Sequence, residues 1–201
     1  LANDFQKLSL WIVTTILDIE DLSSRAKHLK KMIDLGKALF DMDNYLSSIA
    51  VVSGLTNAAV HRLTTTWHKL DKKTKHKWES LKTLTMNQRN YRNIREVTNE
   101  RLDILPFFGI SLTDIVFMIE GNPRPTTPCF NLRIVLMIEV VISRFILSRH
   151  PLFSRVDEHT LARAMGLFES NVLQEETMMD DAELFKRSLV LQPRALPKKY
   201  K

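Results

Sequence analysis

Cysteine and glycine are both scarce in this chain, and each scarcity excludes a class of protein. Cys129 is the only cysteine among 201 residues, so the chain cannot form an internal disulfide framework or a thiolate metal site by itself. Five glycines and seven prolines leave little material for many tight hairpins, whereas the abundant Leu, Lys, Met, Arg and Glu favour helix. The composition predicts an all-α protein from a reducing, intracellular compartment.

Long hydrophobic runs are also missing. The longest, at 134–147, is interrupted by Glu139 and Arg144 and is too short to cross a bilayer. The N-terminus lacks a charged region followed by an apolar stretch and a cleavage site, so no secretory signal is predicted. We therefore expect a soluble, cytoplasmic protein without a transmembrane segment.

The charge of the chain decides little about its partners. A formal net charge of +6 is modest for 201 residues and is spread along the sequence, so it indicates no nucleic-acid partner and argues only weakly for an anionic membrane. The densest basic stretch lies at 69–82. We interpret it as a solvated helix face, with a patch facing phosphate or a membrane surface as the alternative.

Catalytic motifs are absent too. The sequence has no G-x-S-x-G, no Walker-type glycine loop, no H-E-x-x-H and no C-x-x-C, so we expect neither a metal nor a cofactor. Asp157-Glu158-His159 is the one local acid–base cluster, and it lies at a predicted helix start, where carboxylates interact favourably with the helix dipole. A helical hydrolase with a dispersed site stays an alternative, although no nucleophile and base form a recognisable arrangement.

Apolar residues recur at helical spacing along most of the chain. The pattern is strongest at 21–40, where they return every three or four residues. Asp43 or Asn44 can cap a following helix that Gly54 would close, because glycine tolerates the left-handed conformation after a last turn. Helices are predicted at 3–20, 21–40, 45–54, 58–70, 72–86, 89–100, 157–175 and 179–188. Residues 189–201, which contain two prolines, are predicted to run extended.

The most informative segment is 106–123, which reads P-F-F-G-I-S-L-T-D-I-V-F-M-I-E-G-N-P. A short helix is predicted to begin near Ser111 or Leu112 and to stop at Gly121-Asn122-Pro123. The segment resembles the helical-hairpin signature of Ras-family guanine-nucleotide exchange factors, the RasGEF family, whose pattern is roughly P-F-(F/L)-G-x-x-L-T-D-(I/L)-x-F-x-x-E-G-N-P. Nearly every fixed position of that pattern is matched.

Further blocks resemble the same family in the same order. Residues 44–67 read N-Y-x-S-S-I-A-V-V-S-G-L followed by V-x-R-L-x-x-T-W, residues 184–194 read L-F-x-x-S-L-x-L-x-P-R, and similar matches lie at 5–11 and 89–95. The resemblance implies one catalytic domain over 1–201, a helical bundle with a protruding helical hairpin at 111–149. Periodicity cannot separate helix from strand in the second arm, about 129–149, so helix is predicted there from length and from the resemblance.

The resemblance implies that the chain releases GDP from a small GTPase of the Ras, Rap or Ral type, without covalent chemistry and without a cofactor. In this family, the position of Val116 brings apolar bulk to the magnesium site and the position of Glu120 brings negative charge near the phosphates. Other positions imply GTPase contacts or support of the site. The candidate GTPase contacts are Ile49, Tyr91, Phe107, Thr113 and Asp114, and the supporting residues are Arg62, Trp67, Asn90, Arg95 and Asn122. Ile49, Tyr91 and Phe107 would line a pocket for the second GTPase switch, with plain core as the alternative.

Departures from the family pattern leave a second function open. Leu is more usual than Val at position 116, and the second arm reads C-F-N-L-R-I-V-L at 129–136, where the family usually has I-N-F-S-K-R and a basic run. The family's domain also carries residues ahead of the block that starts at Phe5, so we expect its N-terminal part to be missing here. An inactive RasGEF-like scaffold that binds a partner is therefore the main alternative, and recruitment to a membrane surface stays open.

Overall fold

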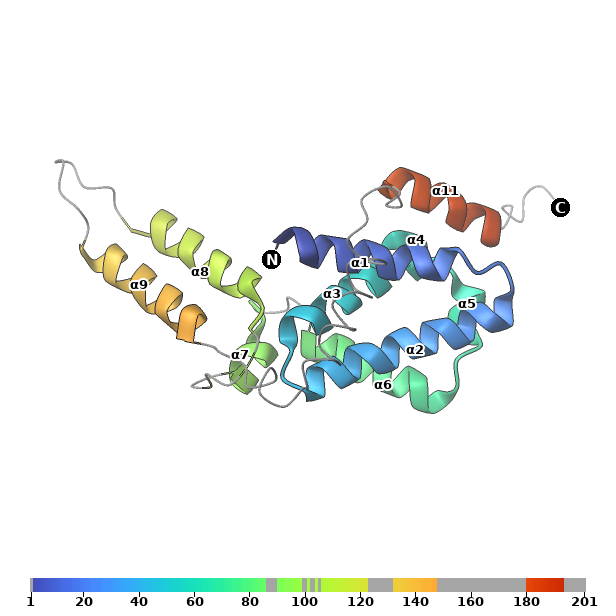
Figure 1. Ribbon diagram of the computed structural model, residues 1–201, viewed down its shortest axis with the longest axis horizontal. Coiled ribbons are helices and arrows are strands. Elements are labelled where there is room, and N and C mark those ends of the chain that lie inside the picture. Colours follow the sequence, from blue (N-terminus) through green and yellow to red (C-terminus); the bar gives the residue numbers. More distant parts are fainter. Residues whose placement is uncertain are drawn as a thin grey trace, which may run out of the picture.

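The computed structural model describes residues 2–85, 90–98, 101, 104, 106–122, 132–147 and 180–193, and its elements in those ranges are all helices (Figure 1). The all-α prediction is confirmed. The helices are α1 (Ala2–Leu17), α2 (Leu22–Asp41), α3 (Tyr45–Thr56), α4 (Ala58–His61), α5 (Thr64–His68), α6 (Lys72–Thr85), α7 (Arg92–Thr98), α8 (Phe108–Glu120), α9 (Leu132–Leu147) and α11 (Asp181–Leu191). None of these helices is long and apolar enough to span a bilayer.

A helical body is built around α3, which packs against both α1 and α2. Burial of apolar side chains drives this packing. Ile12 and Ile16 of α1, Leu29 and Ile33 of α2 and Leu55 of α3 are buried in one core cluster, to which α6 and α11 add Leu81 and Leu184. The predicted amphipathic face of α2 therefore does face the core.

Gly54 was expected to close the third helix, and that expectation is wrong. Helix α3 continues to Thr56, with Gly54 buried inside it. A Cβ built on Gly54 would lie 2.6 Å from the carbonyl oxygen of Ser9 and 2.9 Å from Cβ of Ile12. Glycine is needed here because α1 and α3 approach too closely for any side chain between them, not because the backbone turns.

The single helix predicted at 58–70 is also wrong, because the chain forms two short helices there, α4 and α5. The backbone leaves the helical region at Leu63, whose ψ is 59°, and the Leu63 side chain is buried in the core. Arg62 beside it reaches across to α11. Tertiary contacts of these two residues therefore override the local helical periodicity.

Several other boundaries differ from the sequence prediction. Helix α7 begins only at Arg92, since Asn90 and Tyr91 both adopt a φ of 55°, which a helix cannot contain. Helix α8 begins at Phe108 rather than near Ser111, and α11 continues to Leu191 into the stretch expected to be extended. The predicted helix at 157–175 and residues 123–128, which connect the two predicted arms of the hairpin, lie outside the described residues.

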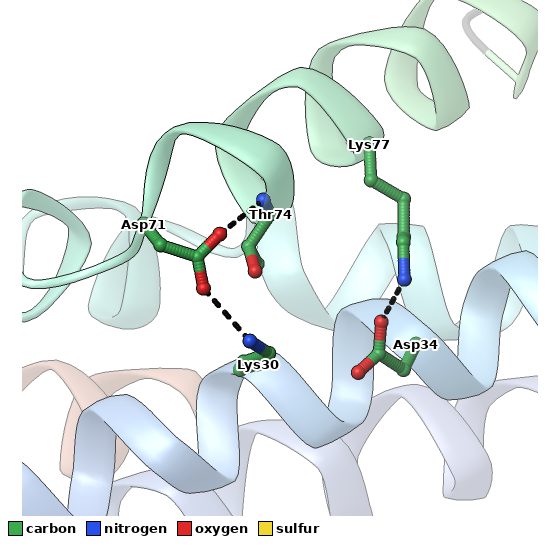
Figure 2. A network of polar contacts seen from close by, with 5 residues as sticks. All are labelled: Lys30, Asp34, Asp71, Thr74 and Lys77. Carbon is green, nitrogen blue, oxygen red and sulfur yellow. Dashed lines mark hydrogen bonds and ion pairs between the residues drawn. The ribbon is translucent and has the colours of Figure 1, made fainter.

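Ion pairs join α2 to α6 across the surface of the body (Figure 2). The Lys30 ammonium lies 2.7 Å from a carboxylate oxygen of Asp71, and Lys77 pairs with Asp34. Asp71 also accepts a hydrogen bond from the backbone N–H of Thr74, at 2.7 Å, at the start of α6. The hydrogen bonds from Lys30 and Thr74 hold the pKa of Asp71 well below its ordinary value. Part of the basic stretch at 69–82 therefore docks α6 on α2.

Candidate functional site

Helices α8 and α9 pack against one another and project from the body as a two-helix arm (Figure 1). No side chain of α8 is buried, and the described side chains of α9 are all half-buried or exposed. Large apolar residues are nevertheless frequent in both helices. The exposed ones are Leu112, Val116, Phe117, Ile119, Leu132, Val135, Leu136, Val140, Ile142 and Ile146. Exposed apolar side chains concentrated on two packed helices are typical of an interaction site rather than of a folding core.

Val116 and Glu120 lie on this arm, four residues apart and therefore on the same face of α8. Val116 is 48% exposed and its neighbour Phe117 is 61% exposed. Glu120 is exposed at the last position of the helix, and no hydrogen bond or ion pair joins its carboxylate to another described residue. An apolar side chain and an uncompensated carboxylate are therefore presented together near the outer end of α8.

An ion pair between Arg95 of α7 and Asp114 of α8 attaches the arm to the body. Nη1 of Arg95 donates to Oδ2 of Asp114 at 2.9 Å and Nη2 donates to Oδ1 at 2.6 Å. The same guanidinium donates through Nε to the backbone carbonyl of Asn90, at 2.8 Å. Arg95 therefore holds both the turn before α7 and the base of the arm, and a bidentate pair of this kind fixes orientation as well as distance.

The residues predicted to receive a GTPase switch gather in one apolar cluster at the base of the arm. This hairpin-base cluster consists of buried Tyr45, Leu46, Ile49, Ile94, Ile104 and Phe107. Tyr91 packs against it with its ring centroid 5.4 Å from that of Phe107, and burial raises the pKa of the Tyr91 phenol. The structure therefore brings Ile49, Tyr91 and Phe107 together, with Ile49 and Phe107 buried and Tyr91 half-buried.

Gly109 belongs to this base, and sequence reasoning did not single it out. A Cβ on Gly109 would lie 2.4 Å from Cζ of Phe107, so the Phe107 ring folds back under the first turn of α8. Phe5 of α1 closes the other side of that ring, with centroids 5.5 Å apart. The glycine in P-F-F-G is the sequence signal that could have indicated this close approach.

A second bidentate pair, also missed from the sequence, lies on the same side of the body. Arg101 donates to both carboxylate oxygens of Asp43, at 2.8 and 2.7 Å. Asp43 has a φ of 60° and accepts a further hydrogen bond from the Tyr45 hydroxyl at 2.8 Å. The pair ties the segment that leads to α8 to the turn between α2 and α3.

Thr113 and Asn122 make hydrogen bonds within the arm itself. The Thr113 hydroxyl donates to the carbonyl of Gly109 at 2.8 Å. The Asn122 side-chain amide donates to the carbonyl of Met118 at 2.6 Å, and so satisfies a carbonyl that the end of the helix leaves free. Asn122 therefore terminates α8 directly after Glu120.

Arg62 and Trp67 lie in the body, away from the arm. The Arg62 guanidinium donates to the carbonyls of Ser188 and Gln192 and lies 5.6 Å from the centre of the Phe185 ring. The Trp67 indole donates to the carbonyl of Val60 at 3.1 Å. Arg62 therefore fastens α11 to the junction of α4 and α5, and neither residue contacts the arm in the described structure.

Comparison with known sequences gives the class of the protein. The sequence model of the RasGEF domain family matches residues 1–135, so the chain belongs to the RasGEF domain family. The match covers the helices from α1 to α8 and ends in the first turn of α9. The divergence of the second arm noted in the sequence therefore coincides with the end of the family match.

Curated relatives carry names of exchange factors. Ras guanine nucleotide exchange factor K of Dictyostelium discoideum is 38% identical over 125 residues, which are 62% of this chain and 8% of that protein. Ras-specific guanine nucleotide-releasing factor 1 of Mus musculus is 27% identical over 192 residues, 94% of this chain and 15% of that protein. Ras-specific guanine nucleotide-releasing factor RalGPS2 of Homo sapiens is 33% identical over 121 residues, 59% of this chain and 21% of that protein. The chain therefore spans less than a quarter of each of these relatives.

Proposed function

We propose that this chain releases GDP from a small GTPase of the Ras family, with the arm formed by α8 and α9 as its active element. One observation carries the proposal: within a RasGEF domain, the arm exposes apolar side chains that its own fold leaves uncovered. Large exposed apolar surfaces mark sites that a partner covers. The intracellular setting expected from the composition belongs to the same proposal.

Val116 and Glu120 would act on the nucleotide site of the GTPase. A GTPase holds its nucleotide through phosphate contacts and a magnesium ion with oxygen ligands. The Val116 side chain would bring apolar bulk to the place of that ion, and apolar atoms cannot supply oxygen ligands. The Glu120 carboxylate, which has no partner among the described residues, would repel the phosphates or replace them as an anion.

Exchange of this kind needs no covalent step. An exchange factor that binds the nucleotide-free GTPase more tightly than the loaded form lowers the affinity of the GTPase for nucleotide. Bound nucleotide lowers the affinity of the GTPase for the exchange factor by the same ratio. Fresh nucleotide, once bound, would therefore displace the chain. The arm must keep its position while nucleotide competes for the GTPase, and the ion pair between Arg95 and Asp114 supports the arm at its base.

The hairpin-base cluster would meet the second switch of the GTPase through its half-buried rim. Tyr91, which packs against this cluster, is the accessible residue, whereas Phe107 is 9% exposed and also supports Gly109. Phe107→Ala would therefore weaken the cluster as well as any contact with a partner. Tyr91→Ala, compared with Tyr91→Phe, separates a contact of the ring from one of the hydroxyl. Thr113 and Asp114 would add polar contacts from α8.

Release of a fluorescent GDP analogue from Ras, Rap and Ral proteins tests the proposal. The wild-type chain should accelerate release from at least one of them, and Glu120→Ala should lower that rate about tenfold, equivalent to about 1.4 kcal/mol of lost stabilisation. Glu120→Gln keeps the size of the side chain and isolates its charge. Glu20→Ala, an exposed glutamate between α1 and α2, is the matched control and should leave the rate unchanged.

Two results would count against the proposal in different ways. If the chain binds one of the GTPases and yet leaves every release rate at its intrinsic value, the result would favour the inactive RasGEF-like scaffold. The end of the family match at residue 135 also suggests that alternative. An active chain whose rate is untouched by Glu120→Ala and by Tyr91→Ala would retain exchange but remove the proposed site.

A further inference from the structure

A hollow of about 510 Å³ lies between the α4–α5 segment and α6. In Figure 1, α5 is at the end of the body away from α8 and α9. Two indoles line the hollow, those of Trp67 and Trp78, with ring centroids 5.2 Å apart. The hollow is open to solvent, and its volume is enough to admit a small molecule. It lies outside the proposed exchange surface.

The polar lining of the hollow is mainly basic. Lys75 and Lys82 approach it from α6, and His61 and His68 from the opposite side. Among the lining residues that the structure describes, Glu79 is the one carboxylate. Neither lysine forms an ion pair with another described residue, in contrast to Lys77, which is paired with Asp34. The two ammonium groups are therefore available to an anionic ligand.

The spacing of the two lysines constrains the shape of that ligand. Lys75 and Lys82 lie seven residues apart, which places their Cα atoms about 10 Å apart along the same side of α6. Trp78 lies between them. The Lys75 ammonium donates one hydrogen bond to the carbonyl of His68 at 3.0 Å, so that carbonyl holds it over the hollow while its other protons stay free. The two ammonium groups start from separate turns of α6, so anionic groups on separate positions of one ring can engage both at once.

The indole pair argues against a flat aromatic ligand. The rings of Trp67 and Trp78 are tilted by 38° and pack on one another. Trp78 is only 6% exposed and belongs to the core, so the half-buried Trp67 offers one wall rather than one side of a slot that would sandwich a nucleobase. Such a wall can accept the C–H face of a saturated ring. Clusters of lysines on a helix surface are also a recurring feature of sites that bind anionic lipid headgroups.

We propose that this hollow binds a phosphorylated inositol ring, through Lys75 and Lys82 at the phosphates and the tryptophan wall at the ring. Such a ring is carried by membrane phosphoinositides and by soluble inositol phosphates. The site is separate from the proposed exchange surface, so loss of one activity would not imply loss of the other.

Titration of the full chain with inositol 1,4,5-trisphosphate, followed by tryptophan fluorescence, tests the proposal directly. Trp11→Phe provides a background in which the only remaining indoles are the two that line the hollow. Saturable fluorescence change is expected with inositol trisphosphate, with at least about tenfold weaker binding of inorganic phosphate because phosphate alone cannot use the wall. Equal affinities for inorganic phosphate and inositol trisphosphate, or tighter binding of GTP, would overturn the proposal.

Two double variants of equal charge provide the decisive comparison. Lys75→Gln with Lys82→Gln removes the lysines of the hollow, whereas Lys72→Gln with Lys73→Gln removes two exposed lysines of the same helix that do not line it. The first should weaken binding of inositol trisphosphate about tenfold or more and the second about twofold or less. Equal losses in both would mean that general surface charge binds the anion, and the proposed site would fall.

Vesicles separate the two sources of the ligand. The chain is tested for binding to phosphatidylcholine vesicles that contain either a phosphoinositide or phosphatidylserine at equal charge. Binding only to the phosphoinositide vesicles, with competition by soluble inositol trisphosphate, would assign the site to a membrane. Binding of inositol trisphosphate without binding to these vesicles would assign it to a soluble inositol phosphate. Equal binding to both kinds of anionic vesicle, unaffected by inositol trisphosphate, would contradict the site.

Discussion

Arg95 binds Asp114 with both ends of its guanidinium, at 2.9 and 2.6 Å, and this pair is the polar link between α7 and the base of the projecting arm. Its side chains are only partly exposed, at 34% and 25%. A partly buried bidentate pair is worth more than an exposed one, about 1 to 2 kcal/mol. Arg95→Ala should therefore loosen the arm and lower the rate of GDP release with little change in helix content.

A double-mutant cycle of Arg95→Ala and Asp114→Ala would measure the coupling, expected to be about 1 kcal/mol in the free energy of unfolding. Arg92→Ala is the control, because its pair with Glu96 is 60% exposed on both sides and should contribute under about 0.5 kcal/mol. Strictly additive effects at Arg95 and Asp114 would show that the pair does not hold the arm.

Gly54 should be intolerant of any side chain. Gly54→Ala places Cβ 2.6 Å from the Ser9 carbonyl oxygen, so α1 and α3 must separate, at a cost of about 3 kcal/mol, the upper end for overpacking. Gly36→Ala is a matched control in the interior of α2, because its nearest contacts are the ends of the Leu81 and Val51 side chains, at 3.0 and 3.2 Å.

Both substitutions gain the same helix propensity, about 1 kcal/mol. The difference between their free energies of unfolding therefore isolates the cost of the contact with the Ser9 backbone. Urea unfolding followed by circular dichroism measures it. Similar midpoints for the two variants would mean that α1 and α3 adjust without cost, contrary to the packing described.

Arg25 should be one of the most important polar residues for stability. Its buried guanidinium donates to the Thr66 hydroxyl at 3.0 Å and to the carbonyls of Ile19 and Glu20 at 2.8 and 2.9 Å, and burial lowers the pKa of this group. Arg25→Met keeps the aliphatic stem and removes the donors, and should cost about 3 kcal/mol. Lys27→Met, exposed on the same helix, should cost less than about 0.5 kcal/mol. Comparable losses in thermal stability would contradict this role.

His28 should make folding sensitive to mild acid. Its Nε2 is buried without a hydrogen bond in the described structure, and burial, helped by the charge of Lys31, lowers the pKa of the imidazole below its ordinary value of 6.5. As the pH falls through 6.5, the unfolded chain takes up the proton before the folded chain does, so stability decreases towards the lower folded pKa.

Melting temperatures at pH 7.5 and pH 5.5 test this prediction. His28→Gln should reduce the difference between the two temperatures, because it removes the group that titrates differently in the two states. His76→Gln, at an exposed position on α6, is the control. A wild-type difference that persists in the His28 variant would place the acid sensitivity elsewhere.

Helix positions followed well from the sequence where the helix is amphipathic and capped. Helix α2 was expected at 21–40 and occupies Leu22–Asp41, with Asp21 accepting from the N–H of Ser24 as its cap. Helix α6 was expected at 72–86 and occupies Lys72–Thr85. Apolar periodicity and capping are properties of neighbouring residues, so the chain displays them before it folds.

Predictions failed where distant residues decide the local backbone. The break between α4 and α5 depends on the burial of Leu63 and on the bonds of Arg62 to a segment more than a hundred residues away in sequence. The turn at Asn90 and Tyr91 is held by Arg95. Asparagine adopts a positive φ more readily than most residues, but nothing local indicates one at Tyr91. Long-range contacts of this kind outweigh propensities of a few tenths of a kcal/mol.

The sequence by itself determined the helical class, most helix positions, the RasGEF resemblance and the choice of Val116 and Glu120 on one helix face, because composition, period and motif are read along the chain. Only the tertiary structure decided that Arg95 forms an ion pair with Asp114 and that Gly54 lies against the backbone of Ser9. It also decided that Gly109 packs against the Phe107 ring, and that Lys75 and Lys82 border a hollow with two tryptophans. These relationships join residues that lie apart in sequence or across a turn, and they exist only once burial of the apolar core has brought the helices together.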